Sequence, residues 1–143
     1  MIKIMFVCHG NICRSPMAEF VMKKMAEEKG ISDKVYIASS ATSTEEIGNP
    51  VYPPARRELE KHGINPSGKY AVQVTRADYD KYDKFICMDS NNIRNIMRIF
   101  GKDPENKVSM LLTRDVADPW WTGNFEITYN DIYEGCIKLI IEL

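Results

Sequence analysis

Apolar residues gather in short runs along the chain, and these runs predict buried strands. The first run, which ends at Cys8, contains β-branched and aromatic members: Ile2, Ile4, Met5, Phe6 and Val7. Similar runs cover residues 35–38, 85–88 and 108–111, and residues 69–74 are predicted to be a weaker strand or an extended connection. The pattern thus supplies four strands and one uncertain segment.

Segments with helical spacing and helix-end signals separate these runs. Pro16 suits the first position of a helix, because its φ is already helical and its missing N–H would have no intrahelical partner there. That helix carries an apolar stripe and ends at Gly30. Further helices are predicted over residues 53–61, over the short capped segment 75–78, after Asp89 through residue 100, and over residues 127–143.

Strands and helices therefore alternate along the whole chain. This order predicts an α/β fold: a doubly wound, roughly four-stranded parallel sheet with helices on both faces, as in a flavodoxin-like three-layer sandwich. We expect residues 1–143 to form a single domain, because this length suits one core. Ligands of such sheets bind outside the carboxyl ends of the strands, where Cys8 and Asp89 each follow a predicted strand.

Composition and charge exclude several classes of partner. The net charge is -1, so no basic surface for nucleic acid or anionic lipid is expected. No apolar run is long enough to span a membrane, and the first residues lack the features of a signal peptide. Four cysteines are too few for the disulfide framework of a secreted domain, and a cytoplasmic location is expected.

The stretch between the first strand and the first helix reads VCHGNICRSP, from Val7 to Pro16. The start of the helix directs free N–H groups and the positive end of its dipole at this stretch, which favours a bound dianion. The spacing from Cys8 to Arg14 lets the backbone curl around a tetrahedral oxyanion. Gly10 and Asn11 accept the positive φ values that such a curl requires. We therefore predict a phosphate-binding loop.

Two side chains give this loop its expected chemistry. Arg14 can hold phosphate oxygens with two parallel N–H···O bonds, a geometry that Lys cannot copy. Cys8 at the floor of the loop is the candidate nucleophile, because a positive field favours the reactive thiolate. Ser15 can donate a hydrogen bond to its sulfur.

Other roles for these cysteines fit the sequence less well. A cysteine after a strand is commonly a small buried hydrophobic residue, but Cys8 is surrounded by loop residues of functional types. A zinc site of Cys8, His9 and Cys13 lacks the usual ligand spacing and a second cluster, so neither a metal nor a cofactor is expected. Under oxidation, Cys13 is expected to form a reversible, protective disulfide with Cys8.

The segment from Cys8 to Glu19, CHGNICRSPMAE, resembles the signature of the low-molecular-weight protein tyrosine phosphatases. The resemblance covers nearly the whole chain, because further matching segments follow in the family's order: residues 39–50 (SSATSTEEIGNP), 62–64 (HGI), 87–89 (CMD) with Asn92, and 118–119 (DP). It implies a cysteine-dependent phosphatase whose partners are phosphotyrosine-containing proteins or peptides, with inorganic phosphate or other oxyanions also held in the loop.

The resemblance also implies supporting roles for other residues. Phosphate binding or loop support is expected of six residues of the loop: His9, Gly10, Asn11, Ile12, Cys13 and Ser15. Ser39 matches a serine that hydrogen-bonds the loop asparagine. Glu45 and Glu46 match positions at the pocket mouth that influence substrate choice, although a solvated loop explains them equally well. Asp89 matches an acidic residue near the pocket, and is otherwise explained as a helix N-cap.

A second informative stretch, residues 115–124, reads DVADPWWTGN and predicts a loop, because the residue before Pro is steered away from the helical region. Transfer of a phosphoryl group to Cys8 requires a proton for the leaving oxygen, and Asp118 matches the Asp-Pro general acid of the family. Tyrosines often follow that pair in the family, but this chain has Trp120 and Trp121. These are either local core anchors or an aromatic wall that stacks on a phenyl ring.

Three alternatives stay open at this stage. A thiol-dependent arsenate reductase of the same fold usually needs a further cysteine pair, and only Cys87 and Cys136 remain, in core-like segments. A protein arginine phosphatase tends to carry Thr in place of Ile12. A binding or redox-sensing module would use Cys8 and Cys13 without turnover. His9, where the family often has an apolar residue, either lines the pocket rim or faces solvent.

Overall fold

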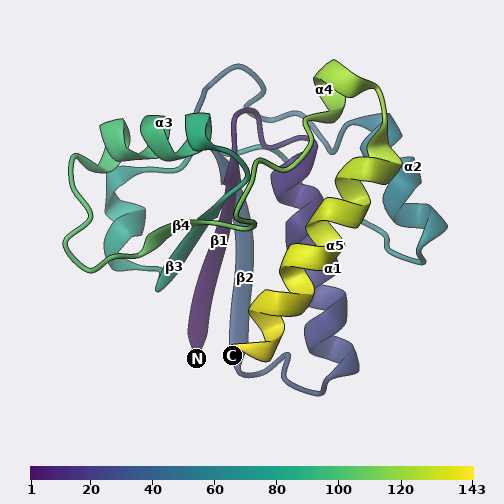
Figure 1. Cartoon of the computed structure of the whole chain (residues 1–143), viewed down its shortest axis with the longest axis horizontal. Helices are drawn as coiled ribbons and strands as arrows, with labels where there is room; N and C mark the ends of the chain where they lie inside the picture. Colours follow the sequence, from purple (N-terminus) through teal and green to yellow (C-terminus); the bar gives the residue numbers. More distant parts are fainter.

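Four parallel strands form the centre of the computed structural model, which describes residues 1–143 (Figure 1). They are β1 (Ile2–Cys8), β2 (Val35–Ala41), β3 (Lys84–Cys87) and β4 (Val108–Met110). Their order in the sheet is β2-β1-β3-β4, so the chain winds outward in both directions from β1. In the register of the ladders, Val7 of β1 lies beside Ser40 of β2 and Cys87 of β3. The carboxyl ends of these three strands therefore meet at one edge.

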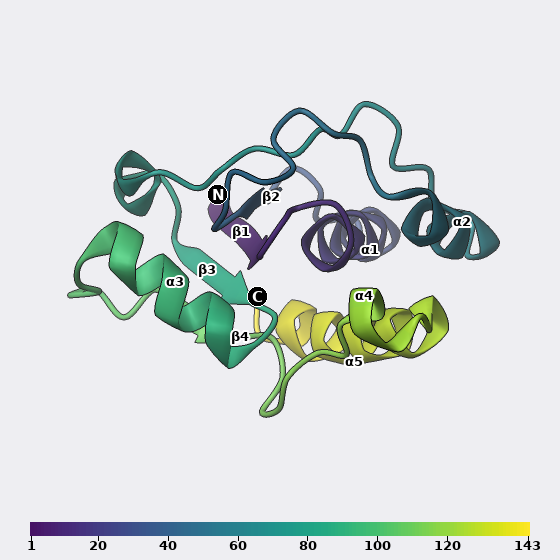
Figure 2. The ribbon, with the colours of Figure 1, turned by 90° about the horizontal axis from the view of Figure 1, so that it is seen from above.

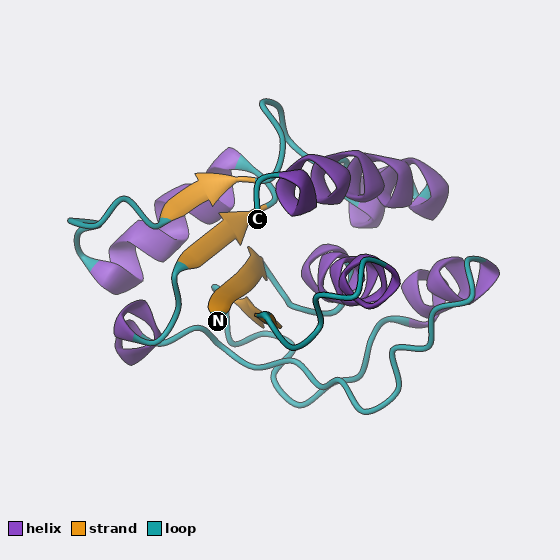
Figure 3. Cartoon of the chain, turned by 90° about the horizontal axis from the view of Figure 1, so that it is seen from below, coloured by secondary structure: helices purple, strands orange, loops and turns teal.

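Helices cover both faces of this sheet (Figures 2 and 3). One face carries α1 (Arg14–Glu28), α2 (Pro53–Lys61) and α5 (Phe125–Ile141), and the other carries α3 (Ser90–Phe100) and the 3-10 helix η1 (Arg76–Asp80). The predicted three-layer α/β fold with a four-stranded parallel sheet is confirmed. None of the helices combines the length and the apolar character needed to cross a membrane.

Successive side chains of a strand point to opposite faces of the sheet, and this alternation divides the core into two clusters. Ile4 and Phe6 of β1 belong to the larger cluster, which α1 and α5 cover, whereas Met5 and Val7 belong to the smaller cluster under α3. The side chain of Cys8 points to the same face of the sheet as those of Ile4 and Phe6. The phosphate-binding loop, which starts at Cys8, therefore begins on the face that α1 covers.

The structure decides between two options for one predicted element and corrects two others. Residues 69–74, predicted to be a weaker strand or an extended connection, form a connection with two isolated bridges: Tyr70 bridges Pro50, and Gln73 bridges Ala41. The first helix begins at Arg14, before Pro16, with Cys13 at its N-cap. The predicted loop over residues 115–124 contains a short helix, α4 (Pro119–Thr122), because Asp118 caps it by accepting a hydrogen bond from the Trp120 N–H.

Candidate active site

A pocket of about 450 Å³ opens at the carboxyl end of the sheet. Its lining includes the first part of the phosphate loop, the 45–46 segment, the start of α3 and the Asp118–Trp121 segment. Every candidate site residue contributes to this lining except Ser15 and Ser39, which lie behind it. The fold thus brings together residues that are more than 100 positions apart in the chain.

Three backbone carbonyl groups of the loop are hydrogen-bonded to neighbouring segments. The carbonyl oxygens of Cys8 and Ile12 accept hydrogen bonds from the N–H groups of Thr42 and Tyr52. The His9 carbonyl accepts two, from the Ser43 N–H and the Ser43 hydroxyl. Because these carbonyl groups bind neighbouring segments, the loop can direct its backbone N–H groups at a bound anion. Such a concave arrangement of N–H groups is typical of phosphate-binding loops.

Asn11 is the one residue of the loop with a positive φ, at 60°. Gly10 does not adopt a positive φ, so the reason expected for this glycine is wrong. Its small size matters instead, because a Cβ at position 10 would lie only 3.3 Å from the Glu46 Cγ. Gly10 therefore allows the 45–46 segment to approach the loop closely.

A chain of buried hydrogen bonds holds Asn11 in this conformation. Its Nδ2 donates to the Ser15 Oγ at 2.7 Å and to the Ser39 Oγ at 2.9 Å. Its Oδ1 accepts a bond from the Val72 N–H at 3.1 Å. The predicted contact between Ser39 and Asn11 is confirmed, and the strained residue has every side-chain polar atom engaged.

Sequence reasoning missed the next layer of this network, which contains Glu19 and Lys69. Glu19 is only 4% exposed, and its Oε1 accepts a 2.6 Å hydrogen bond from the Ser39 hydroxyl. The Lys69 Nζ donates to the Ser39 carbonyl at 2.9 Å and lies 3.9 Å from the Glu19 Oε1. Burial lowers the pKa of Lys69, and the nearby Glu19 opposes this shift. Glu19 belongs to the matched signature, but only its burial reveals a role.

The Cys8 sulfur lies at the floor of the pocket and is 4% exposed. It is hydrogen-bonded to the Ser15 hydroxyl at 3.0 Å, and the Asn11 N–H donates to it at 3.3 Å. Cys13 also lines the pocket, but burial and the neighbouring Cys8 raise its pKa to about 12. Cys13 therefore keeps its proton at neutral pH, and its disulfide with Cys8 under oxidation stays a prediction.

Arg14 is buried beside two carboxylates that come from distant parts of the chain. Its Nη1 donates to the Asp89 Oδ2 at 2.9 Å and to the Val116 carbonyl at 3.1 Å, and its Nη2 lies 3.5 Å from the Asp118 Oδ2. Burial alone would lower the pKa of Arg14, but Cys8, Asp118 and Asp89 outweigh it and raise the pKa. The guanidinium therefore stays charged and is fixed at the pocket.

The Asp89 carboxylate has two roles in this arrangement. Its Oδ1 accepts a hydrogen bond from the Asn92 N–H, which makes it the N-cap of α3, and its Oδ2 binds Arg14. The N-cap interpretation is confirmed, and Asp89 also lines the pocket, while its role in the function stays a prediction.

The two tryptophans stand at the pocket mouth rather than in the core. Trp120 is 61% exposed and Trp121 is 84% exposed, so the core-anchor interpretation is wrong. The Trp120 ring packs against the ring of Tyr52, with 5.4 Å between their centroids. An aromatic surface beside the thiol is therefore available to a ligand.

His9 and Glu45 form another part of the pocket rim. The His9 Nε2 lies 2.9 Å from the Glu45 Oε2, and both side chains are exposed. His9 thus lies at the rim, one of its two expected positions. Three further lining residues, Asn91, Asn92 and Asn95, were not predicted to belong to the site, although they lie in the first turns of the helix that Asp89 caps.

Comparison with known proteins assigns the chain that forms this pocket to a protein family. The family model described as low molecular weight phosphotyrosine protein phosphatase matches residues 3–143. The chain belongs to this phosphatase family. The low molecular weight protein-tyrosine-phosphatase YfkJ of Bacillus subtilis is 37% identical, over 100% of this chain and 96% of that protein.

Several solved structures share the fold of this chain. The crystal structure of YfkJ superposes with a TM-score of 0.96 over 99% of this chain and 94% of that one. SP-PTP, the low molecular weight protein tyrosine phosphatase of Streptococcus pyogenes, is 40% identical, with a TM-score of 0.94 over 100% and 93% of the two chains. Wzb of Vibrio vulnificus, solved in complex with benzylphosphonate, is 25% identical, with a TM-score of 0.87 over 99% of each.

The buried network behind the phosphatase loop can be tested by changing Ser39 to Ala. This removes the acceptor of the Asn11 amide and the donor to Glu19, and it leaves both partners buried without their bond. We expect the free energy of unfolding to fall by about 1–3 kcal/mol. Because Asn11 loses a hydrogen bond that fixes the conformation of the loop, we expect kcat/KM for an aryl phosphate to fall about tenfold.

Ser43→Ala is the matched control, because its hydroxyl donates to the same loop, at the His9 carbonyl, but from an exposed position. We expect less than half the loss of stability and a change in kcat/KM of about twofold at most. Thermal unfolding and steady-state kinetics measure both variants. Equal effects of the two changes would contradict the bracing role of Ser39.

Proposed function

We propose that this chain is a cysteine-dependent protein-tyrosine phosphatase that hydrolyses aryl phosphate monoesters through a phosphocysteine intermediate. The observation that carries the proposal is the meeting of the Cys8 thiol, the Arg14 guanidinium and the Asp118 carboxyl group at one pocket. Membership of the phosphatase family over residues 3–143 supports it.

In the proposed first step, the Cys8 thiolate attacks phosphorus, and the bond from phosphorus to the phenolic oxygen breaks. Asp118 donates a proton to the departing oxygen. The loop N–H groups and Arg14 hold the equatorial oxygens, where charge stabilisation lowers the barrier most. Asp89 and the Val116 carbonyl keep the guanidinium in place for this task.

In the second step, Asp118 accepts a proton from a water molecule that attacks the phosphocysteine. The sulfur–phosphorus bond breaks, inorganic phosphate forms and the Cys8 thiolate returns. The Ser15 hydroxyl and the Asn11 N–H, which already contact the sulfur, stabilise it as a leaving group. The phosphate-binding loop is completed by four further residues: His9, Gly10, Ile12 and Cys13.

Phosphotyrosine is the substrate that best suits the pocket. The exposed Trp120 and Trp121 can stack on a phenyl ring while its phosphate reaches the thiol at the floor. The benzylphosphonate complex of Wzb, a relative of 25% identity, supports a ligand with an aromatic ring and a phosphorus oxyanion. Glu45 and Glu46 at the mouth contact residues that flank the phosphotyrosine.

The arrangement of the other cysteines argues against an arsenate reductase. Cys87 and Cys136 are both fully buried, and they lie in the two separate core clusters. Burial raises the pKa of Cys87 to about 12 and also raises that of Cys136. Neither thiol can therefore receive a disulfide from Cys8 and pass it to the surface.

The direct test compares three phosphorylated peptides of one sequence, carrying phosphotyrosine, phosphoarginine or phosphoserine at the same position. We expect kcat/KM for phosphotyrosine to exceed the other two by about 100-fold or more, because phosphoserine is too short to reach past the rim and phosphoarginine has no aryl ring to stack on the tryptophans. Phosphate release measures all three. Faster release from phosphoarginine would show an arginine phosphatase instead.

We also propose that residues 1–143 act as one phosphatase domain in the cytoplasm. The nucleophile requires a reduced thiol, and all four cysteines are free. Such chemistry suits a reducing compartment.

A further inference from the structure

Two walls of the pocket differ in charge. One wall is formed by Glu45 and Glu46, with His9 paired to Glu45. The other wall is the start of α3, which contributes three neutral side chains to the lining: Asn91, Asn92 and Asn95. A peptide that carries the phosphate therefore meets an acidic loop on one side and α3 on the other.

The face of α3 that begins at the pocket continues as a cationic surface. Asn91, Arg94, Asn95 and Arg98 are spaced three or four residues apart, so they share one side of the helix. Both arginines are exposed, and Lys102 follows directly after the helix end at Gly101. No Asp or Glu occurs from residue 90 to residue 102. We call Arg94, Arg98 and Lys102 the α3 cationic face.

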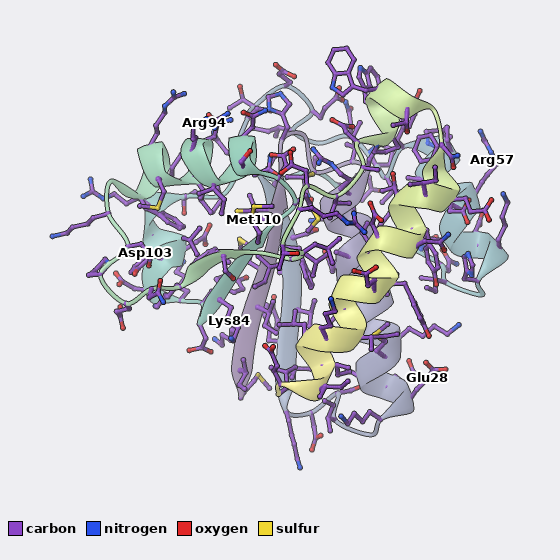
Figure 4. All side chains as sticks on the ribbon, in the orientation of Figure 1. Glu28, Arg57, Lys84, Arg94, Asp103 and Met110 are labelled. Atoms are coloured by element: carbon purple, nitrogen blue, oxygen red, sulfur yellow. The ribbon has the colours of Figure 1, made fainter.

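The two arginines lean back toward the pocket. The Arg94 guanidinium donates to the Asn91 side-chain oxygen, and the Arg98 Nη1 donates to the Asn95 Oδ1 at 3.2 Å. Both acceptors are pocket-lining residues one helical turn nearer to Cys8. Figure 4 shows Arg94 above α3, at the same end of the molecule as α4.

No carboxylate of the chain neutralises these cations. None of the ion pairs of the chain involves Arg94, Arg98 or Lys102. The nearby acidic groups are otherwise engaged: Asp89 binds Arg14, and Asp115 accepts the Ser90 N–H at the helix start. Asp103, beyond the helix end, accepts bonds from Tyr79, Lys107 and Val108.

We propose that the α3 cationic face binds acidic residues that flank the phosphotyrosine of the substrate. This inference rests on the proposed phosphatase function and specifies its substrate class: phosphotyrosine segments with Asp or Glu on one side. Guanidinium groups bind carboxylates with paired donors, and an acidic chain avoids the wall of Glu45 and Glu46. The substrate is thereby oriented across the mouth with its acidic side on α3.

The spacing of the arginines indicates which acidic pattern fits. Arg94 and Arg98 are separated by about 6 Å along the helix axis, from a rise of 1.5 Å per residue. Residues i and i+2 of an extended peptide are about 6.6 Å apart and point to the same side. Two acidic residues separated by one position therefore match the two guanidinium groups.

The test uses phosphotyrosine peptides with Glu-Ala-Glu, Ala-Ala-Ala or Lys-Ala-Lys placed either before or after the phosphotyrosine. At low ionic strength, we expect kcat/KM of one Glu-Ala-Glu peptide to exceed that of its lysine counterpart about tenfold, since each exposed pair contributes a factor of up to about five. In about 0.5 M salt, this ratio should fall below about twofold, because the charges are exposed and screened.

The variant Arg94→Gln/Arg98→Gln should reduce the tenfold ratio to less than about twofold. The matched control is Arg57→Gln, an exposed arginine on α2, on the far side of the molecule from α3 in Figure 4. It should leave the ratio unchanged. Each peptide value is divided by the same variant's kcat/KM for p-nitrophenyl phosphate, which corrects for any effect on folding or on the chemical step.

The two proposals fail in different ways. Absence of p-nitrophenyl phosphate hydrolysis by the unmodified chain would overturn the phosphatase function itself. Hydrolysis with equal kcat/KM for the acidic, neutral and basic peptides would overturn only the docking role of α3. A preference for acidic peptides that survives the double variant would also overturn it.

Discussion

Cys8→Ser is expected to reduce the hydrolysis of an aryl phosphate by at least about 10⁴-fold, because it removes the proposed nucleophile. The serine hydroxyl is a far weaker nucleophile than a thiolate at neutral pH, and no base contacts the side chain at position 8. The nearest polar neighbours of the sulfur are the Ser15 hydroxyl and the Asn11 N–H. Steady-state assays with p-nitrophenyl phosphate measure the loss.

Cys13→Ser is the matched control for this experiment. Cys13 lines the same pocket, but its raised pKa keeps it protonated. We expect it to retain activity within about tenfold, because the substitution changes packing in the loop but not the attacking group. Comparable losses in both variants would show that the loop had been disrupted rather than that Cys8 is the nucleophile.

The intermediate provides a second, independent measurement. Rapid acid quenching of the unmodified enzyme with substrate should yield a chain that is heavier by one phosphoryl group, located on the peptide that contains Cys8. Cys8→Ser should give no such species at that position. A phosphoryl group found on His9 instead would contradict the proposed mechanism.

Much of the fold could be predicted from the sequence because its signals are local. Apolar runs gave all four strands, and the alternation of strands with helices is sufficient for a parallel sheet. The segment 69–74 could not be decided between a weak strand and an extended connection, because Tyr70 and Gln73 pair with two different neighbours that only the tertiary structure determines. Helix α4 was missed because Asp118 and Pro119 are equally suited to a turn and to a helix start.

The candidate site was predictable to the extent that its residues belong to a recognisable segment. The loop from Cys8 to Ser15 and the Asp118–Pro119 pair could be named in advance. Glu19 and Lys69 could not, because a glutamate on a surface helix is ordinarily exposed, and only the fold places it beneath Ser39. The exposure of Trp120 and Trp121 was likewise undecided until their surroundings were known.

Asp118→Asn tests the proposed general acid more sharply than a truncation would. Asparagine keeps an oxygen that can accept the Trp120 N–H, so the start of α4 is preserved while the transferable proton is lost. The change also removes the negative charge 3.5 Å from the Arg14 Nη2, which leaves the guanidinium bound to Asp89 and the Val116 carbonyl. A loss of rate that increases with the pKa of the leaving group can then be assigned to proton transfer.

The expected result depends on the leaving group. For phosphotyrosine, whose phenol has a pKa of about 10, kcat/KM should fall about 10²- to 10³-fold. Esters of more acidic phenols need less protonation, so p-nitrophenyl phosphate should lose much less. Plotting log kcat/KM against the pKa of the phenol should give a steeper slope for Asp118→Asn than for the unmodified chain.

Asp115→Asn supplies the control for this series. Asp115 lies three residues away and accepts the Ser90 N–H, but it does not line the pocket. Its substitution removes the same charge close to α3 without touching the proposed proton donor, so its slope should match that of the unmodified chain. Parallel lines for all three proteins would mean that Asp118 gives no proton to the leaving group, and that another acid or water carries out this step.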